Sequence, residues 1–314
     1  MKNWDYKKLK IAVFGDYCLD EYLFIDAALN EPSLETGLTA YQCTRREVYP
    51  GAAGTIAKNL SHLGVGEIYA VGCVGDDGRG LELRRGLGQL VGITDRLVIT
   101  NERSTPTYTK PWLTENGEIR ELNRIDAKNW TPTPRALEDA ALANLKSLIG
   151  KIDALIIMDQ LTEENCGIVT DRLRAEIAEI ARENPNLLIF ADSRCRIDLF
   201  EGIIIKGNNH EIPPERCDEL MKRNGKPVVC TLGEKGVAVH HSGGRIEIPG
   251  IPLDCQLDVT GAGDMFSANF VAALSAGAEL EEAARVGNIA ASLCVQQLGT
   301  SGRVTRDDII GFYA

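Results

Sequence analysis

The sequence has no long apolar run, no long run of lysine and arginine, and no closely spaced pair of cysteines. No stretch approaches the length of a membrane-spanning helix, and the apolar run 11–14 is too short for a secretory signal. The net charge of −11 gives little support to a surface that binds nucleic-acid phosphates. Nine scattered cysteines without CxxC pairs indicate reduced thiols rather than zinc or redox centres. We therefore expect a cytoplasmic protein that binds neither membranes nor nucleic acid.

Two common nucleotide-binding motifs are missing as well. The sequence contains no G-x-x-x-x-G-K-[ST], and Gly86-Leu87-Gly88 lies inside a helical pattern rather than after a strand. Both observations argue against P-loop and Rossmann sites. The four histidines form neither an HExxH motif nor a ligand cluster, so we do not expect a catalytic transition metal.

Short apolar runs alternate with longer amphipathic segments along the chain. This alternation predicts a mainly parallel sheet that is covered by helices on both faces. The predicted strands are 10–15, 67–74, 153–158, 187–192, 203–206 and 227–232, and the predicted helices are 52–63, 78–89, 134–149, 162–183, 213–224, 263–276 and 279–297.

Two regions break this alternation. Residues 17–50 and 97–125 lack helical periodicity and contain β-prone stretches, with a turn at Asn116-Gly117. We predict that they form a small β lid over the carboxyl ends of the central strands, where open α/β sheets bind ligands. The whole chain, 1–314, is then a single domain.

The most informative segment is 257–264, Leu-Asp-Val-Thr-Gly-Ala-Gly-Asp, which precedes an apolar-periodic run. At such a helix start the N–H groups of Gly261, Ala262 and Gly263 would point at one spot and hold an anion. Asp264, beside these donors, can accept the proton of a hydroxyl that attacks a phosphoryl group. Since an exposed Asp has a pKa of about 3.9, we expect an ionised but weak base. The alternative is a glycine-rich turn whose Asp only caps the helix.

Asp258-Val259-Thr260-Gly261-Ala262-Gly263-Asp264 resembles the D-[TV]-T-G-A-G-D signature of the PfkB carbohydrate kinases. The resemblance implies a ribokinase-like three-layer α/β/α fold, with ATP, Mg²⁺ and K⁺ as cofactors. It makes Asp264 the catalytic base and residues 261–263 the anion hole. Asp258 and Ser301, the latter in a loop that resembles the family's terminal loop, would bind the monovalent cation. Relatives dimerise through the lid, which implies a homodimer.

The segment 50–64 resembles the family's amino-terminal motif, a glycine turn that opens a helix. Ala52 and Thr55 depart from it, because the family has glycine and asparagine there. Gly15-Asp16 resembles the position whose carboxylate binds two sugar hydroxyls; a simple turn Asp is the alternative, and Asp20 is a weaker candidate. The predicted acceptor-binding residues are Asp16, Gly51, Thr55, Asn59 and, in the lid, Arg124.

Three further segments resemble nucleotide-binding positions of the family. The NxxE spacing of Asn208 and Glu211 implies contact with the ATP phosphates and water-mediated binding of Mg²⁺, which prefers oxygen ligands. A helix cap is the alternative for this pair. The other predicted nucleotide-binding residues are Thr231, Gly233 and Gly236 in a T-x-G-x-x-G loop, and Asn288 near the adenine.

Within the family the sequence most resembles the kinase domain of the bifunctional D-glycero-β-D-manno-heptose 7-phosphate kinases, without their adenylyltransferase domain. We therefore expect a sugar or sugar-phosphate acceptor. A phosphate on the acceptor would need basic side chains, for which the candidates are Lys110, Arg124, Arg194 and Arg196. The alternatives are a non-catalytic sugar-binding regulator and a nucleoside kinase with a base pocket drawn from Tyr17, Tyr22, Tyr41 and Trp112.

Overall fold

A computed structural model describes residues 4–297 and 302–313. Its central sheet has the strand order β18-β17-β16-β15-β14-β13-β1-β6-β8. Pairing is parallel from β16 to β8, and the β17–β18 hairpin adds two antiparallel strands at one edge. The strands are β1 Lys10–Gly15, β6 Glu67–Val71, β8 Ile93–Asp95, β13 Ala154–Asp159, β14 Leu188–Ser193, β15 Ile204–Asn208, β16 Val228–Thr231, β17 Gly236–His241 and β18 Gly244–Pro249.

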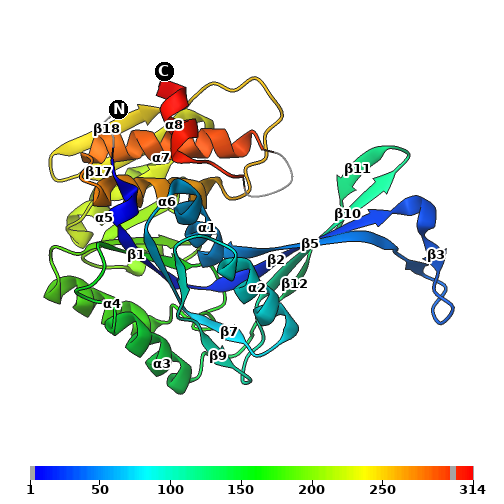
Figure 1. Ribbon diagram of the computed structural model, residues 1–314. Helices are drawn as coiled ribbons and strands as arrows, with labels where there is room; N and C mark the ends of the chain where they lie inside the picture. Colours follow the sequence, from blue (N-terminus) through cyan, green and yellow to red (C-terminus); the bar gives the residue numbers. More distant parts are fainter. Residues whose placement is uncertain (1–3, 298–301, 314) are drawn as a thin grey trace.

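Helices cover both faces of this sheet (Figure 1). Their bounds are α1 Ala53–Leu63, α2 Gly78–Gly88, α3 Arg135–Lys146, α4 Asp171–Glu183, α5 Cys217–Asn224, α6 Ala262–Ser275, α7 Leu280–Val295 and α8 Arg306–Tyr313. Short 3-10 turns lie at Tyr6–Lys8, Ala27–Leu29, Ile197–Leu199, Pro214–Arg216 and Gly233–Lys235. This three-layer arrangement confirms the predicted fold class.

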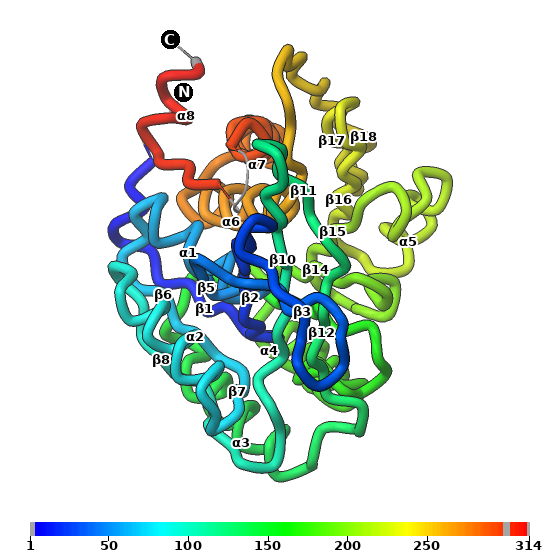
Figure 2. Tube along the Cα trace, turned by 90° about the vertical axis from the view of Figure 1, so that its right-hand side faces the viewer, coloured from blue at the N-terminus to red at the C-terminus, as the bar shows by residue number. Residues whose placement is uncertain are grey.

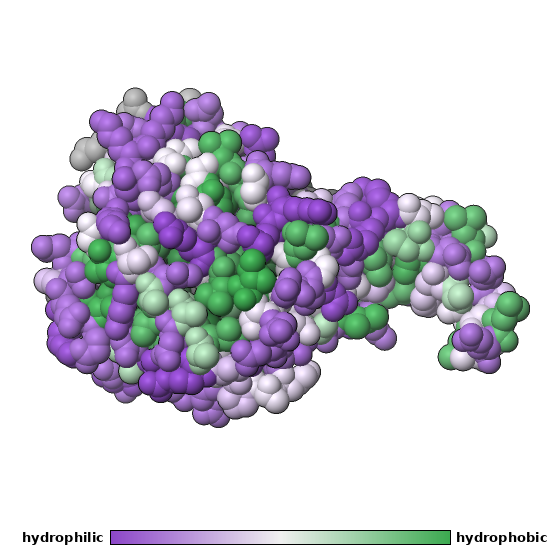
Figure 3. All heavy atoms as spheres, turned by 60° about the horizontal axis from the view of Figure 1, so that its bottom comes forward, coloured by the Kyte–Doolittle hydropathy of each residue, from purple (hydrophilic) through white to green (hydrophobic). Residues whose placement is uncertain are grey.

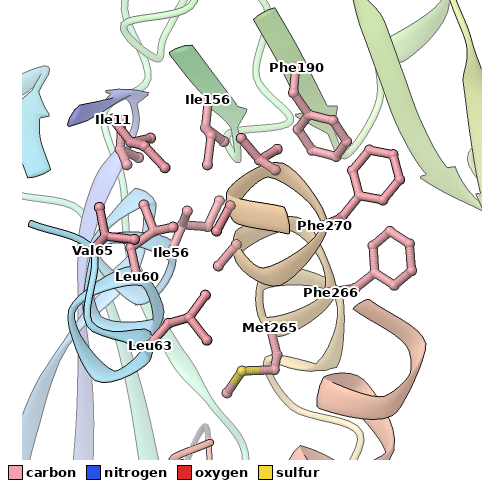
Figure 4. Packing of buried hydrophobic residues seen from close by; sticks show 14 of the residues in the cluster. Ile11, Ile56, Leu60, Leu63, Val65, Ile156, Phe190, Met265, Phe266 and Phe270 are labelled. Carbon is pink, nitrogen blue, oxygen red and sulfur yellow. The ribbon is translucent and has the colours of Figure 1, made fainter. Parts of the chain in front are cut away.

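The alternation of side chains along β1 divides the core into two clusters. Ile11 and Val13 pack in one cluster with α1, α6 and α7, whereas Ala12 and Phe14 pack in the other with α3, α4 and α5. Successive strand residues point to opposite faces, so a strand buried on both faces is apolar throughout. Figure 4 shows α1 and α6 side by side in the first cluster. The apolar side chains of α6 therefore anchor the helix that begins at the glycine motif.

A second sheet projects from the body as an arm (Figures 1 and 2). It has the order β11-β10-β2-β5, with β12 also paired to β10. Its strands are β2 Tyr17–Asp26, β5 Cys43–Ala52, β10 Thr107–Glu115, β11 Glu118–Glu121 and β12 Ile125–Ala127, and a short pair, β3 Glu31–Pro32 and β4 Thr39–Ala40, lies at the tip. Because β2 begins just after β1 ends, this sheet rises from the carboxyl edge of the central sheet. Figure 3 shows hydrophobic side chains along the arm.

Several predicted elements need correction. Helix α4 begins at Asp171 rather than 162, because Thr170 caps it and 162–170 is a loop. The segment 97–100 is not part of the arm, since β9 Val98–Thr100 pairs with β7 Cys73–Gly75. The sequence analysis missed β8, β17, β18 and α8. The predicted turn is confirmed: Asn116 and Gly117 have φ of 52° and 83°, as a tight hairpin requires.

The structure bears on two features of the sequence, its lack of long apolar runs and its scattered cysteines. None of the helices formed by residues 4–297 and 302–313 has the length and apolarity needed to cross a bilayer. All nine cysteines lie in this part of the chain, and each is a free thiol.

Candidate active site

The glycine motif forms the first turn of α6. Gly261 is the N-cap and has φ of 76°, a left-handed conformation that costs glycine little. Ala262 follows as the first helical residue, and its N–H already donates to the Val259 carbonyl at 3.3 Å. One of the three predicted anion donors is therefore engaged within the turn. Asp264 lies in the same first turn, as predicted.

Asp264 differs from the exposed carboxylate expected from sequence. Burial of its carboxyl group and the nearby charge of Asp192 raise its pKa to about 7, while Lys206 and Arg194 act in the opposite direction. A general base is most effective when its pKa lies near the working pH. The structure thus makes Asp264 a stronger base than an exposed Asp, with a protonation state that is sensitive near neutral pH.

The sequence analysis missed the charged pair beside this turn. Lys206 on β15 and Asp192 on β14 are both buried, and Lys206 Nζ lies 2.5 Å from Asp192 Oδ2. A Cβ atom added to Gly263 would lie 3.1 Å from Lys206 Nζ, so this ammonium group borders the start of α6. The sequence did contain a signal for this pair, because Lys206 directly follows the apolar run 203–205 of a predicted buried strand. A charged side chain is seldom buried there without a partner.

The predicted nucleotide residues meet at the carboxyl ends of β15 and β16, where Asn208 and Thr231 are paired in register. Glu211 Oε2 accepts a hydrogen bond from the Asn208 N–H at 2.8 Å, and Asn208 Oδ1 accepts one from the Glu211 N–H at 3.0 Å. This reciprocal cap fixes both side chains. Gly233 and Gly236 have φ of 60° and 95° in the following turn.

The residues around Glu211 fit a magnesium nucleotide. Burial and Asp192 raise the pKa of Glu211, whereas Lys206 and Arg194 oppose this shift. In the described part of the chain, no group of three or more His, Cys, Asp or Glu could hold a metal on its own. Mg²⁺ in kinases is typically bound by one or two carboxylates together with the substrate phosphates. Glu211 fits such a site, in which the nucleotide supplies further ligands.

Two other predicted cofactor positions lie farther along the chain. Asn288 on α7 donates from its side-chain amide to the Pro249 carbonyl at 3.0 Å, next to the end of β18. Asp258 Oδ1 accepts the Thr260 N–H at 2.9 Å within the turn that leads to α6. Ser301, the second predicted cation ligand, lies outside the described residues.

Asp16 lies within a network of backbone hydrogen bonds at the end of β1. Its Oδ2 accepts the N–H groups of Gln160 and Leu161 at 2.9 and 3.1 Å, and its Oδ1 accepts the N–H of Ile168 at 2.8 Å. The side chain is buried and ties the end of β1 to the loop before α4. The three backbone N–H groups hold the carboxylate at the end of β1 and leave one of its acceptor positions open, so its contact with acceptor hydroxyls stays a prediction.

Thr55 and Asn59 are both buried on α1. The Thr55 hydroxyl donates to the Pro50 carbonyl at 3.3 Å across the start of α1. Asn59 is 1% exposed, and neither polar atom of its side chain has a hydrogen-bond partner among the described residues. The backbone bond engages the Thr55 hydroxyl, whereas the Asn59 amide keeps its donors and acceptor unused, and contact of both residues with the acceptor stays a prediction.

Asp20 is the carboxylate that faces the site from β2. A Cβ atom on Gly51 would lie 2.6 Å from Asp20 Oδ2, which explains why this close approach needs glycine. Lys110 Nζ on β10 lies 3.3 Å from Asp20 Oδ1 and 3.1 Å from the Tyr22 hydroxyl. The charge of Asp20 also acts on Asp264, whose pKa it helps to raise. Asp20 and Gly51 thus lie opposite the glycine motif.

The arginines proposed for a phosphate-bearing acceptor separate into two groups. Arg196 is committed to Asp159 and to backbone carbonyls, and Arg124 forms a two-pronged pair with Asp126. Arg194 is exposed, its Nε lies 3.3 Å from the Gln160 side-chain oxygen, and its charge acts on Asp264. Arg194 is therefore the arginine of this set best placed for a phosphate group.

Comparison with known families gives one decisive match. The model of the pfkB family carbohydrate kinases matches residues 9–306, nearly the whole chain. The chain belongs to the pfkB family. This membership confirms the predicted family and its enzyme class, the carbohydrate kinases.

The curated relatives of this pfkB member include bifunctional proteins named HldE. The protein of Bradyrhizobium sp. (strain ORS 278) is 27% identical over 303 residues, and that of Pelobacter propionicus is 28% identical over 306 residues. These alignments cover 91% and 92% of this chain, but in each case only 60% of the relative. The chain therefore spans about three fifths of the length of the relatives it matches.

Solved structures support the fold of this pfkB kinase. Phosphofructokinase-2 from Escherichia coli has a TM-score of 0.72 at 19% identity, over 97% of this chain and 98% of that one. Ribokinase from Arabidopsis thaliana, solved with ribose and ATP, has a TM-score of 0.68 at 20% identity, over 96% and 98%. At these identities the likeness concerns the fold.

Proposed function

We propose that the chain transfers the γ-phosphoryl group of Mg·ATP to a hydroxyl of a sugar or sugar phosphate, with Asp264 as general base. The observation that carries this proposal is a half-buried Asp264 with a pKa of about 7 in the first turn of α6. A carboxyl group with such a pKa can take a proton from an attacking hydroxyl near neutral pH. The α6 N-terminus favours the phosphoryl charge beside it.

In this proposal, the nucleotide lies along the ends of β15 and β16. Asn208 and Thr231 border the phosphates, and Glu211 orients Mg²⁺ through water. The bound Mg²⁺ would neutralise charge that develops on the phosphoryl oxygens. The amides of residues 261–263 supply further stabilisation, and the Ala262 N–H must exchange the Val259 carbonyl for the phosphoryl group. K⁺ remains a proposal based on Asp258 and Ser301.

The acceptor is proposed to bind between β2, the 51–52 turn and α6. Asp20 is the carboxylate available to accept hydrogen bonds from hydroxyl groups, and Lys110 holds it from β10. A phosphate on the acceptor could pair with Arg194, which has no carboxylate partner among the ion pairs of the described residues. These features favour a polar, hydroxyl-rich acceptor.

The aromatic residues give little support to the alternative that the protein is a nucleoside kinase. Tyr17 is buried, and its hydroxyl donates to the Val13 carbonyl at 2.9 Å, so it faces the core. Tyr41 is exposed on the arm, and Tyr22 is engaged by Lys110. A stacked base would need aromatic faces at the site, which Tyr17 and Tyr41 do not offer.

We also propose a homodimer through the arm. Leu34, Leu38 and Ile119 are exposed large apolar side chains on it, and gathered exposed apolar groups are typical of interaction surfaces. Light scattering of the wild type and of a Leu34→Asp/Leu38→Asp variant tests this proposal. A monomeric wild type at working concentrations would contradict it.

The decisive experiment measures ADP release from Mg·ATP, with K⁺ present, across pentoses, hexoses, heptoses, their phosphates and nucleosides. Asp264→Asn is the blank. Turnover on a sugar or sugar phosphate that is lost in the variant supports the proposal, and turnover on nucleosides alone supports the alternative. If ATP binds but no acceptor reacts, the non-catalytic sugar-binding regulator is favoured instead.

A further inference from the structure

Lys206 and Asp192 form an ion pair that the sequence motifs do not account for. They are register partners on the parallel strands β15 and β14, and the side chains are 5% and 9% exposed. Burying two charges carries a large desolvation cost that a close pair only partly offsets. Such a pair adds little stability compared with apolar residues, so its position next to a candidate base suggests a functional reason.

The pair is connected directly to the turn that carries Asp264. Ser267, one helical turn into α6, has its hydroxyl oxygen 3.1 Å from Asp192 Oδ2 and 2.9 Å from the Gly263 carbonyl oxygen. Lys206 Nζ, 2.5 Å from the same Asp192 oxygen, would lie 3.1 Å from a Cβ atom on Gly263. Two strands of the sheet therefore hold both a positive and a negative charge against the residue before Asp264.

We propose that the Asp192–Lys206 pair positions and tunes Asp264: Lys206 keeps the carboxylate ionised and ready to accept a proton, and Asp192 limits that effect. This inference rests on the proposed function, in which Asp264 is the base. Lys206 and Asp192 are positioning residues here, because they act through Asp264 rather than on the reacting atoms.

The charges that act on Asp264 come from several elements. Besides burial, Asp192 on β14 and Asp20 on β2 raise its pKa, whereas Lys206 on β15 and Arg194 after β14 lower it. Lys58 on α1 is a further cation within electrostatic range of Asp264. Asp192 and Lys206 carry opposite charges on two adjacent strands, β14 and β15. Removal of its two members should therefore shift the Asp264 pKa in opposite directions.

The experiment uses Lys206→Met and Asp192→Asn in the full chain, with Lys206→Arg as the conservative variant. The Asp264 carboxyl group is titrated by ¹³C NMR of Asp-labelled protein and assigned by its loss in Asp264→Asn. We expect the titration midpoint to rise by on the order of one pH unit in Lys206→Met and to fall in Asp192→Asn. Lys206→Arg should stay near the wild type, because it keeps the charge.

Kinetics give the second readout. The acid limb of the kcat profile should follow the titration, so that Lys206→Met loses roughly five-fold in kcat at pH 7 and recovers at higher pH. A purely structural role would lower kcat at all pH values without moving the limb. Lys10→Met, which removes an ion pair to Glu67 at the opposite end of β1, is the matched control and should leave both readouts unchanged.

The outcomes separate the two proposals. An unchanged Asp264 titration in folded Lys206→Met and Asp192→Asn would overturn the inference, whatever the activity. A shifted titration with a kcat limb that does not follow it would instead reject Asp264 as the base, and with it the proposed function. If either single variant fails to fold, Lys206→Met/Asp192→Asn removes both charges together and should titrate close to the wild type; a large shift there would contradict opposed contributions.

Discussion

The two sides of the candidate site relate to the sequence in different ways. On the carboxy-terminal side, the glycine turn and Asp264 begin α6 as the motif predicted, and Asn208 and Glu211 form the cap that was the alternative for this pair. On the amino-terminal side, Asp16 and Thr55 bond to the backbone, and Asp20 is half-buried between Gly51 and Lys110. A motif of backbone amides and strand ends can be located from spacing alone. The orientation of a single side chain near a strand end cannot be predicted from spacing, because it depends on which neighbouring groups donate hydrogen bonds to it.

The largest expected effect tests the carboxy-terminal side. Asp264→Asn should lower kcat by about 100- to 10,000-fold, the usual value of general-base assistance, and change ATP affinity only a few-fold. Steady-state kinetics together with calorimetric ATP titration measure both quantities. Asp254→Asn, an exposed position in the loop before the motif, is the control. Normal turnover in Asp264→Asn would remove the basis for the proposed mechanism.

The next prediction concerns the structural role of Asp16. Burial and the charge of Asp159 raise its pKa to about 6, although three backbone N–H groups oppose this. The folded protein then binds this proton more tightly than the unfolded chain, whose Asp pKa is about 3.9. The associated stability is complete below about pH 4 and is lost as the pH rises through about 6.

Urea unfolding of the wild type and Asp16→Asn between pH 4 and pH 7 measures this effect. The free energy of unfolding of the wild type, relative to the variant, should fall by about 2 kcal/mol over this range, because the amide does not titrate. A difference that is independent of pH would mean that folding does not raise the pKa of Asp16.

Asp20 should affect acceptor binding rather than folding. A hydrogen bond to a charged group contributes about 1.5–3 kcal/mol, so Asp20→Asn should raise the acceptor KM by roughly 10- to 100-fold. Initial rates at varied acceptor concentration give this value, and Asp26→Asn, at the far end of β2, serves as the control. If KM is unchanged, the acceptor does not contact β2 at this position.

The smallest expected effect concerns the turn between β5 and α1. Ala52 has φ of 52° and ψ of −116°, a conformation that favours glycine. Ala52→Gly should raise the free energy of unfolding by about 1 kcal/mol. The gain from relieved backbone strain exceeds the loss from the larger conformational entropy that glycine gives the unfolded chain. Ala143→Gly, at an exposed position within α3, should lower it by a similar amount. Loss of stability in Ala52→Gly would show that the turn is not strained.

The same distinction applies to the fold. The buried strands and long amphipathic helices followed from periodicity, because each strand of a parallel sheet is apolar on both faces. The β17–β18 hairpin was missed, since the apolar run of β17 is only three residues, 237–239, and the edge strand β18 alternates with polar residues such as Arg245. Helix α4 was predicted too long, because the loop before it is fixed by Asp16, more than a hundred residues earlier.

The sequence by itself determined the family, the layered fold and the location of the glycine motif, because these depend on local periodicity and on backbone groups that every residue carries. The tertiary structure alone decided that Asp264 has a pKa of about 7, that Lys206 and Asp192 border its turn, and that Asp20 lies beside Gly51 and Lys110. These properties depend on charges and donors from strands far apart in the chain, which only the packed sheet brings within a few ångströms of each other.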